Sequence, residues 1–257
     1  MKIDGNVIVV TGGVSGLGQA AVRYLHAQGA KVAAFDLNDG AGAKLVEELG
    51  EGRFLFCHTD VTCEKSVERA IEEVTIFFGT IHACINAAGI PAPCKILEKD
   101  GSAVSLAKFT KVVDVNLNGV FNVMSKCAAV MAKNDPQDSE ERGVIINISS
   151  GAAFEGQIGQ CGYASSKNGV IGLNMPASRE LGRYGIRVNS IAPGLFGTPM
   201  VESLGDKIVQ SLTSMVEAPK RLGKMDEFAH CCQFIIENGY INGTTIRIDA
   251  ATRLKAS

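Results

Sequence analysis

The amino-acid sequence predicts an α/β protein: a single-domain Rossmann fold with a doubly wound parallel sheet of about seven strands. Short apolar, β-branched runs alternate with segments of helical periodicity along the whole chain. Strands that alternate with helices in this way form βαβ units, whose strands run parallel. No linker-like shift in composition divides the 257 residues. We therefore expect one domain that spans residues 1–257 and includes any segments that bind a substrate.

The strands are predicted where apolar runs are short and end in turn residues. The first run, Asn6–Thr11, reads NVIVVT and is followed by Gly12-Gly13, which is typical of a buried parallel strand. By the same criteria, further strands are expected at Ala30–Asp36, Arg53–Thr59, Ile81–Asn86, Gly143–Ser149, Arg187–Ala192 and Thr244–Ile248.

Helices are predicted between these strands. The first is expected over Leu17–Gln28 and stops at Gly29, because glycine is a common helix terminator. The polar run Lys133–Arg142 contains proline and predicts a surface loop. Further helices are expected at Gly42–Leu49, Lys65–Phe78 and Lys108–Met131.

The composition excludes several classes of function. Lys and Arg number 25 against 27 Asp and Glu, so neither sign of charge dominates, which argues against a nucleic-acid or anionic-membrane partner. No apolar stretch approaches the roughly 18–20 residues that span a bilayer. The eight cysteines form no CxxC pair, and we expect buried free thiols and no metal site. The absence of a charge bias fits a protein whose ligand is a small molecule.

The loop between the first strand and the first helix reads TGGVSGLG and spans Thr11–Gly18. Glycine allows the backbone to turn tightly and to approach a pyrophosphate, while a helix N-terminus supplies free N–H groups and partial positive charge. An ordinary glycine-rich turn is the alternative, but the position between a strand and a helix favours nucleotide binding. The residues expected to contact the nucleotide are Gly12, Ser15, Gly16, Leu17 and Gly18.

Asp36 stands at the end of the second strand, where a carboxylate can accept hydrogen bonds from the adenosine ribose. The same carboxylate would repel a 2′-phosphate, and no Arg or Lys stands at Val14, Ser15 or Leu37 to attract one. The sequence therefore favours NAD over NADP as the cofactor.

Two further polar segments come directly after strands. Asp60-Val61 follows the third strand, and Asn86-Ala87-Ala88-Gly89 follows the fourth. Open α/β sheets bind ligands at the carboxyl ends of their strands. Because turn residues also gather there, each segment is weak evidence alone; together they extend the predicted cofactor site to Asp60, Val61, Asn86, Ala87, Ala88 and Gly89.

Tyr163 and Lys167 are four residues apart and share one face if the segment is helical. A nearby ammonium favours the phenolate and would lower the tyrosine pKa from about 10, which would make Tyr163 a usable acid and base for an alcohol. Ser150 lies just after a predicted strand, where its hydroxyl can bond the reacting oxygen. Asn116 lies in a helical stretch, where an amide can brace a kink or hold a water that serves Lys167.

These motifs, in this order and spacing, resemble the NAD-dependent short-chain dehydrogenase/reductase family over nearly the whole chain. The resemblance implies that Asn116, Ser150, Tyr163 and Lys167 are catalytic, with Ser150 and Tyr163 touching the substrate. Tyr163 and Lys167 would also contact the cofactor, with Lys167 bonding the nicotinamide ribose. The segment Pro193–Pro199 resembles the family's nicotinamide-side segment, which implies cofactor contacts from Pro193, Phe196 and Thr198.

Within the family, stretches such as Arg142–Ser150, Ala152–Gln160 and Ile191–Met200 resemble the members that oxidise 3-hydroxyacyl-CoA. The resemblance implies this reaction, a place in fatty-acid metabolism and a homotetramer. We expect substrate beside Ile90–Lys108 and Met200–Pro219. The alternatives are a dehydrogenase of steroids or other hydrophobic secondary alcohols, and a non-catalytic NAD-binding scaffold.

The amino-terminal sequence MKIDGNVIVV lacks the layout of a secretory signal. It also looks shorter than the leader of mitochondrial relatives. We therefore expect a cytoplasmic location, with the mitochondrial matrix as the alternative.

Overall fold

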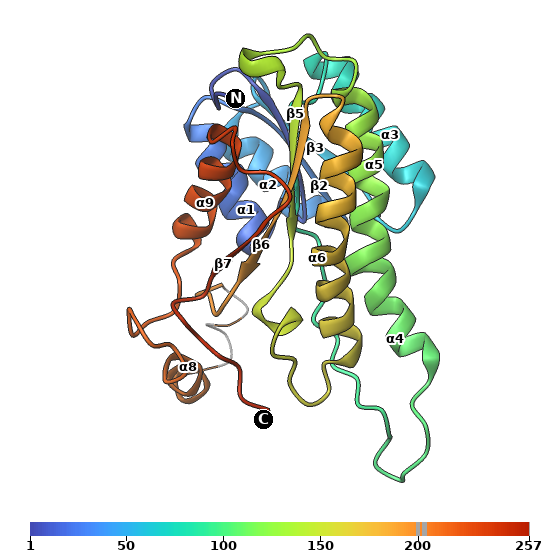
Figure 1. Cartoon of the computed structure of the whole chain (residues 1–257), viewed down its shortest axis with the longest axis vertical. Coiled ribbons are helices and arrows are strands. Elements are labelled where there is room, and N and C mark those ends of the chain that lie inside the picture. Colours follow the sequence, from blue (N-terminus) through green and yellow to red (C-terminus); the bar gives the residue numbers. More distant parts are fainter. Residues whose placement is uncertain (199–200, 202–204, 257) are drawn as a thin grey trace.

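The fold is that of a computed structural model, which describes residues 1–198, 201 and 205–256. Seven strands form one parallel sheet in the order β3-β2-β1-β4-β5-β6-β7 (Figure 1). This confirms the predicted fold class. The strands are β1 (Val7–Thr11), β2 (Lys31–Asp36), β3 (Phe54–His58), β4 (Ala83–Asn86), β5 (Gly143–Ile148), β6 (Ile186–Pro193) and β7 (Thr245–Ile248).

Helices cover both faces of the sheet and bury its apolar side chains. In Figure 1, α1, α2 and α9 lie on one face, and α3, α5 and α6 on the other. Each face has its own cluster of buried apolar side chains between helices and sheet. The helices are α1 (Gly16–Ala27), α2 (Asp39–Leu49), α3 (Glu64–Phe78), α4 (Leu106–Val113), α5 (Gly119–Met131), α6 (Cys161–Gly182), α8 (Asp206–Thr213) and α9 (Met225–Glu237).

The strand order reverses between β1 and β4, and this reversal positions the site. At the carboxyl end of β1, Thr11 pairs with Phe35 of β2 on one side and with Asn86 of β4 on the other. The connections that leave β1 and β4 go to opposite faces of the sheet, so a crevice opens between them. The segments after β1, β2 and β4 therefore meet at one edge.

The expected helix Lys108–Met131 is not continuous. It divides into α4, a π-helical turn at Asp114–Asn118, and α5. A π-turn inserts an extra residue and often occurs at functional sites. Asn116 lies in this turn, and its side chain bonds to the loop after β4 rather than to solvent. The apolar periodicity continues through the turn, which is why the sequence predicts one helix.

The cysteines only partly match the expectation of buried thiols. All eight are free, and five of them are buried, but Cys63 and Cys161 are exposed. Both exposed thiols stand at helix starts, as the N-cap of α3 and the first residue of α6, where the chain turns at the surface. Within the described residues, no helix has the length and apolar character needed to cross a membrane.

Candidate active site

The glycine loop after β1 has no room for a side chain at Gly12 or Gly18. Gly12 has a φ of +64°, and a Cβ added there would lie 3.0 Å from the backbone of Ala88. A Cβ on Gly18 would lie 2.3 Å from the carbonyl oxygen of Gly12. Ser15 caps α1 without a side-chain hydrogen bond, so its hydroxyl does not occupy the first N–H groups of the helix. The loop thus offers unshielded backbone donors at a helix N-terminus.

A cleft of about 780 Å³ opens at the carboxyl edge of the sheet, beside this loop. It brings together most of the site residues expected from the sequence, although these come from segments that are far apart in the chain. The expected residues that line it are Gly12, Ser15, Gly16, Leu17, Gly18, Asp36, Asp60, Val61, Ala87, Ala88, Gly89, Ser150, Tyr163, Lys167, Pro193 and Thr198.

Asp36 lies at the end of this cleft nearest β2. Its carboxylate accepts hydrogen bonds from the backbone N–H groups of Val14, at 3.4 Å, and Asn38, at 3.2 Å. These bonds fix the carboxylate between the glycine loop and the turn into α2. The neighbouring Leu37 is 59% exposed and brings no positive charge to this end of the cleft.

Asn86 and Phe196 do not line the cleft. Asn86 is 1% exposed and donates from Nδ2 to Oδ1 of Asn147 at 2.8 Å, which joins β4 to β5. The Phe196 ring packs edge-on against Phe228 of α9, with 6.4 Å between the ring centroids. The side chains of Asn86 and Phe196 therefore pack against other parts of the fold and do not contact the cleft.

Asn116 is fully buried and lies behind the cleft wall as well. Its Oδ1 accepts from the N–H of Ile90 at 2.8 Å, and its Nδ2 donates to the carbonyl of the same residue at 3.0 Å. Nδ2 also donates to Oγ of Ser166, at 3.2 Å, on α6. Asn116 therefore connects the loop after β4 to the helix that carries Tyr163.

Tyr163 and Lys167 lie one turn apart on α6, as their spacing predicts. The Lys167 Nζ is 5.9 Å from the centroid of the Tyr163 ring and donates to the carbonyl of Ile148 at 2.8 Å. Gly89 faces this ammonium, and a Cβ there would lie 3.3 Å from Nζ and 3.1 Å from Oδ1 of Asn116. A side chain at position 89 would thus crowd both polar groups.

The electrostatics of the pair differ from the expectation. Burial lowers the pKa of Lys167 to about 8. Burial also raises the pKa of Tyr163, against the opposing effect of a hydrogen bond from Ser150. Both groups lie in the same poorly solvated wall, which shifts the pKa of each in the direction of its neutral form. In this structure Ser150, rather than Lys167, favours the phenolate of Tyr163.

Ser150 follows β5 and caps a short 3₁₀ turn, Gly151–Ala153. Its Oγ accepts from the N–H of Ala152 at 3.1 Å. The same hydroxyl lies near enough to Tyr163 to lower the pKa of its phenol. Ser150 is therefore oriented by the turn that follows it.

Several residues of the cleft wall were not expected from the sequence. Lys111 and Val115 line the cleft and are four residues apart, so they lie on one face of the α4 region. This helical spacing just before Asn116 is a sequence signal from which both residues could have been predicted. Pro199 and Met200, which belong to the expected nicotinamide and substrate segments, lie outside the described residues. The other unexpected lining residues are Gln19, Phe35, Leu37, Thr59, Ile148 and Ser149. The lining residues Val14, Ile90, Pro91 and Gly194 lie in the expected glycine loop, substrate segment and nicotinamide-side segment.

The sheet, the glycine loop and the Ser150, Tyr163 and Lys167 group define a dehydrogenase of the short-chain type. The short chain dehydrogenase family model matches residues 6–208. The chain belongs to this family and is an oxidoreductase that acts on CH–OH groups.

Three proteins that are similar to this chain over nearly its whole length carry the same name. The chain is 44% identical to human 3-hydroxyacyl-CoA dehydrogenase type-2, covering 99% of this chain and 97% of that protein. It is 42% identical to the protein of the same name from Drosophila melanogaster, over 98% of this chain and 99% of that one. The crystal structure of 3-hydroxyacyl-CoA dehydrogenase type-2 from Mycobacterium avium superposes with a TM-score of 0.94, at 42% identity and 100% coverage of both chains.

Proposed function

We propose that this protein oxidises the 3-hydroxyl group of a 3-hydroxyacyl-CoA to a 3-oxo group, with NAD as the cofactor. One observation carries the proposal: a single cleft joins the glycine loop and Asp36 at one end to Ser150, Tyr163 and Lys167 at the other. The names of the relatives, which are 42–44% identical, support the substrate class.

The cleft fits a dinucleotide. The positions of Gly12 and Gly18 have no space for a Cβ, as a close backbone approach to phosphates requires. The first turn of α1 would hold the pyrophosphate, and Asp36 the adenosine ribose. Lys167 would bond the nicotinamide ribose, and Thr198 the carboxamide. Bound NAD supplies the hydride acceptor for the alcohol carbon.

The protein's own groups handle the proton and the substrate oxygen. Tyr163, as the phenolate, takes the hydroxyl proton on its phenolic oxygen, and Ser150 holds the substrate oxygen by a hydrogen bond. Lys167 stays mostly protonated at neutral pH, because its pKa of about 8 lies above 7, and the hydrogen bond with Ser150 favours the Tyr163 phenolate as the proton moves. Asn116 holds the loop after β4 against α6, which fixes one wall of the cleft.

The segment 90–108 would receive the substrate. Its lysines are candidates for CoA phosphates, but a solvated charged surface is the simpler explanation. Lys108 donates to Oε1 of Glu98 at 2.6 Å, so its charge is already balanced. The reacting end of the acyl chain would be held by Ser150 and Tyr163.

A second candidate is a steroid or other hydrophobic secondary alcohol, since the same three side chains would serve any such alcohol. The deciding experiment compares kcat/KM for 3-hydroxyacyl-CoA thioesters of several chain lengths with kcat/KM for steroid alcohols, each with NAD and NADP. We expect the highest value for a 3-hydroxyacyl-CoA with NAD. A higher value for a steroid would overturn the substrate, and NAD binding without any turnover would favour a scaffold.

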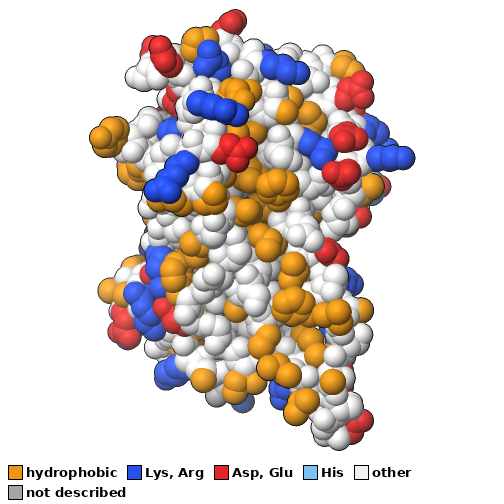
Figure 2. All heavy atoms as spheres, turned by 45° about the vertical axis from the view of Figure 1, so that its right-hand side comes forward, with side chains coloured by type: hydrophobic (Ala, Val, Ile, Leu, Met, Phe, Trp, Pro, Cys, Tyr) orange, Lys and Arg blue, Asp and Glu red, His pale blue; other side chains and the backbone are white. Residues whose placement is uncertain are grey.

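We further propose that the protein assembles as a homotetramer. A groove of about 530 Å³ beside α5 and α6 has the apolar side chains of Leu117, Phe121 and Leu173 in its wall, next to polar ones that include Asn122 and Lys126, and Phe121 is 55% exposed. Figure 2 shows many hydrophobic side chains on this side of the molecule. Sedimentation of the wild type and of Phe121→Glu tests this: we expect a tetramer for the former and a smaller species for the latter. A wild-type monomer would contradict the proposal.

A further inference from the structure

The loop between Ser150 and Tyr163 is held by the carboxyl-terminal segment of the chain. The 3₁₀ turn Gly151–Ala153 begins with Ser150 as its cap, and the N–H of Glu155 donates back to the carbonyl of Gly151 at 3.1 Å. One short turn thus links the Ser150 hydroxyl to the Glu155 side chain. Any contact that fixes Glu155 also restricts Ser150.

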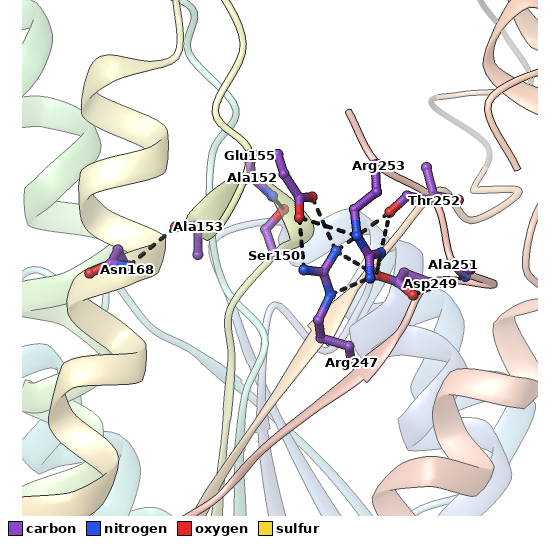
Figure 3. A network of polar contacts seen from close by, with 10 residues as sticks. All are labelled: Ser150, Ala152, Ala153, Glu155, Asn168, Arg247, Asp249, Ala251, Thr252 and Arg253. Atoms are coloured by element: carbon purple, nitrogen blue, oxygen red, sulfur yellow. Dashed lines mark hydrogen bonds and ion pairs between the residues drawn. The ribbon is translucent and has the colours of Figure 1, made fainter. Parts of the chain in front are cut away.

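Arg247, in β7, makes such a contact. Its Nη1 donates to Oε1 of Glu155 at 2.9 Å, and its Nη2 donates to Oε2 at 3.1 Å (Figure 3). Its Nε donates to Oδ2 of Asp249 at 2.7 Å, and the guanidinium lies 4.6 Å from the ring centroid of Phe154. A guanidinium held by two carboxylates and a ring has little freedom, and a two-pronged bond fixes orientation as well as distance.

Other contacts hold the rest of the loop. On the α6 side, Nδ2 of Asn168 donates to the carbonyl of Ala153 at 3.2 Å, and Figure 3 shows this residue reaching the turn from the helix. Toward Tyr163, the N–H of Ile158 donates to the carbonyl of Ala256 at 2.9 Å. The Glu155–Arg247 ion pair lies between these two contacts, and Arg253 makes a longer ion pair with Glu155, from Nε to Oε1 at 3.6 Å.

We propose that Glu155 and Arg247 are positioning residues for Ser150: their ion pair fixes the turn Gly151–Ala153 and thereby aims the serine hydroxyl at the reacting oxygen. The inference rests on the proposed function. Neither side chain lines the cleft, so the pair acts through Ser150 and not on the substrate.

Folding and catalysis should respond differently to the loss of the Glu155–Arg247 ion pair. Glu155 and Arg247 are about one quarter exposed, at 25% and 23%, and a partly solvated ion pair contributes little to stability. Catalysis is more sensitive to position, since a displacement of about 1 Å can cost about 100-fold in rate. Loss of the pair should therefore reduce turnover far more than it reduces folding.

The experiment compares Glu155→Gln with Glu48→Gln, a matched control on α2. Glu48 pairs with Arg23 of α1, away from the loop of residues 150–160. With 3-hydroxybutanoyl-CoA and NAD, we expect Glu155→Gln to lower kcat by about tenfold or more. We expect its KM for NAD to stay within about twofold of the wild-type value, because the cofactor end of the cleft is untouched. The control should match the wild type in both quantities.

The Ser150→Ala background separates positioning from general damage. If the pair acts through Ser150, adding Glu155→Gln to Ser150→Ala lowers single-turnover rates no further, because the hydroxyl it aims is gone. Arg247→Lys, which keeps the charge but loses the two-pronged bond, provides the same test if Glu155→Gln does not fold. A kcat equal to the wild type, or an equal loss in both backgrounds, would overturn the inference. Absence of wild-type turnover with every substrate of the panel would instead overturn the proposed function and the inference together.

Discussion

Asn116 holds Ile90 at both of its backbone polar groups, the N–H at 2.8 Å and the carbonyl at 3.0 Å. The two residues belong to a π-helical turn and to the loop after β4, and only an amide of this length can accept from the one group and donate to the other. The same Nδ2 reaches Ser166 of α6. One buried side chain therefore ties together three segments around the cleft.

Replacing this amide should cost both stability and activity. In Asn116→Asp, the carboxylate can still accept from the Ile90 N–H, but it has no donor for the carbonyl and faces it with negative charge. We expect a loss of about 2–3 kcal/mol in the free energy of unfolding, measured by urea denaturation. Asn118→Ala is the control, because Asn118 lies in the same turn but is exposed and bonds only to Asp114. Equal losses in the two variants would refute the role of Asn116.

Tyr163→Phe should abolish turnover and leave cofactor binding intact. The substitution removes the phenolic oxygen that takes the proton, and the ring that packs in the cleft wall remains. Loss of a general base typically lowers rates by about 100- to 10,000-fold. Stopped-flow turnover and NAD titration by calorimetry measure the two quantities. Turnover at the wild-type rate would remove Tyr163 from the mechanism.

Asp36 should determine the preference for NAD. In Asp36→Ala, the ribose hydroxyls lose their acceptor and a 2′-phosphate is no longer repelled. We expect the ratio of kcat/KM for NAD to kcat/KM for NADP to fall by about 10- to 100-fold, which corresponds to about 1.4–2.7 kcal/mol. Asp39→Ala, an exposed carboxylate that starts α2, is the control. A wild-type enzyme that prefers NADP would contradict the argument from Asp36.

His82 should make the fold sensitive to mild acid. Its Nδ1 accepts from the N–H of Val7 at 3.0 Å, so the folded protein needs the neutral ring. Burial, and then the Lys31 ammonium, lower the pKa of His82 below 6.5. Because the unfolded chain binds the proton more readily, this contribution is complete above pH 6.5 and is lost as the pH falls through and below that value.

His82→Asn keeps an acceptor for Val7 but does not titrate in this range. We expect the difference in unfolding free energy between wild type and this variant to decrease as the pH falls from 7 to 5. Urea denaturation at several pH values measures it. A difference that is independent of pH would show that His82 does not couple to folding.

The sequence determined the architecture and most of the chemistry. Alternating apolar runs and helical segments define βαβ units, and the residues that follow each strand must meet at one edge because parallel strands share a direction. The glycines, Asp36 and Ser150 could therefore be named from their positions relative to the strands, and Tyr163 and Lys167 from their spacing of four residues. α6 was harder to predict, since it contains Gly169, Gly172 and Pro176 and has a weak apolar stripe.

The tertiary structure decided what depends on burial and on partners distant in sequence. The Asn116 turn interrupts the expected helix because Ile90 and Ser166 lie against it, and nothing local in the sequence indicates those partners. The pKa of Tyr163 is raised because the cleft wall buries its own phenol, and the same wall lowers the pKa of Lys167 by burying its ammonium. Arg247 reaches Glu155 across 92 residues of chain. Residue order determines which groups reach the edge of the sheet, but only packing determines how they are solvated and what holds them.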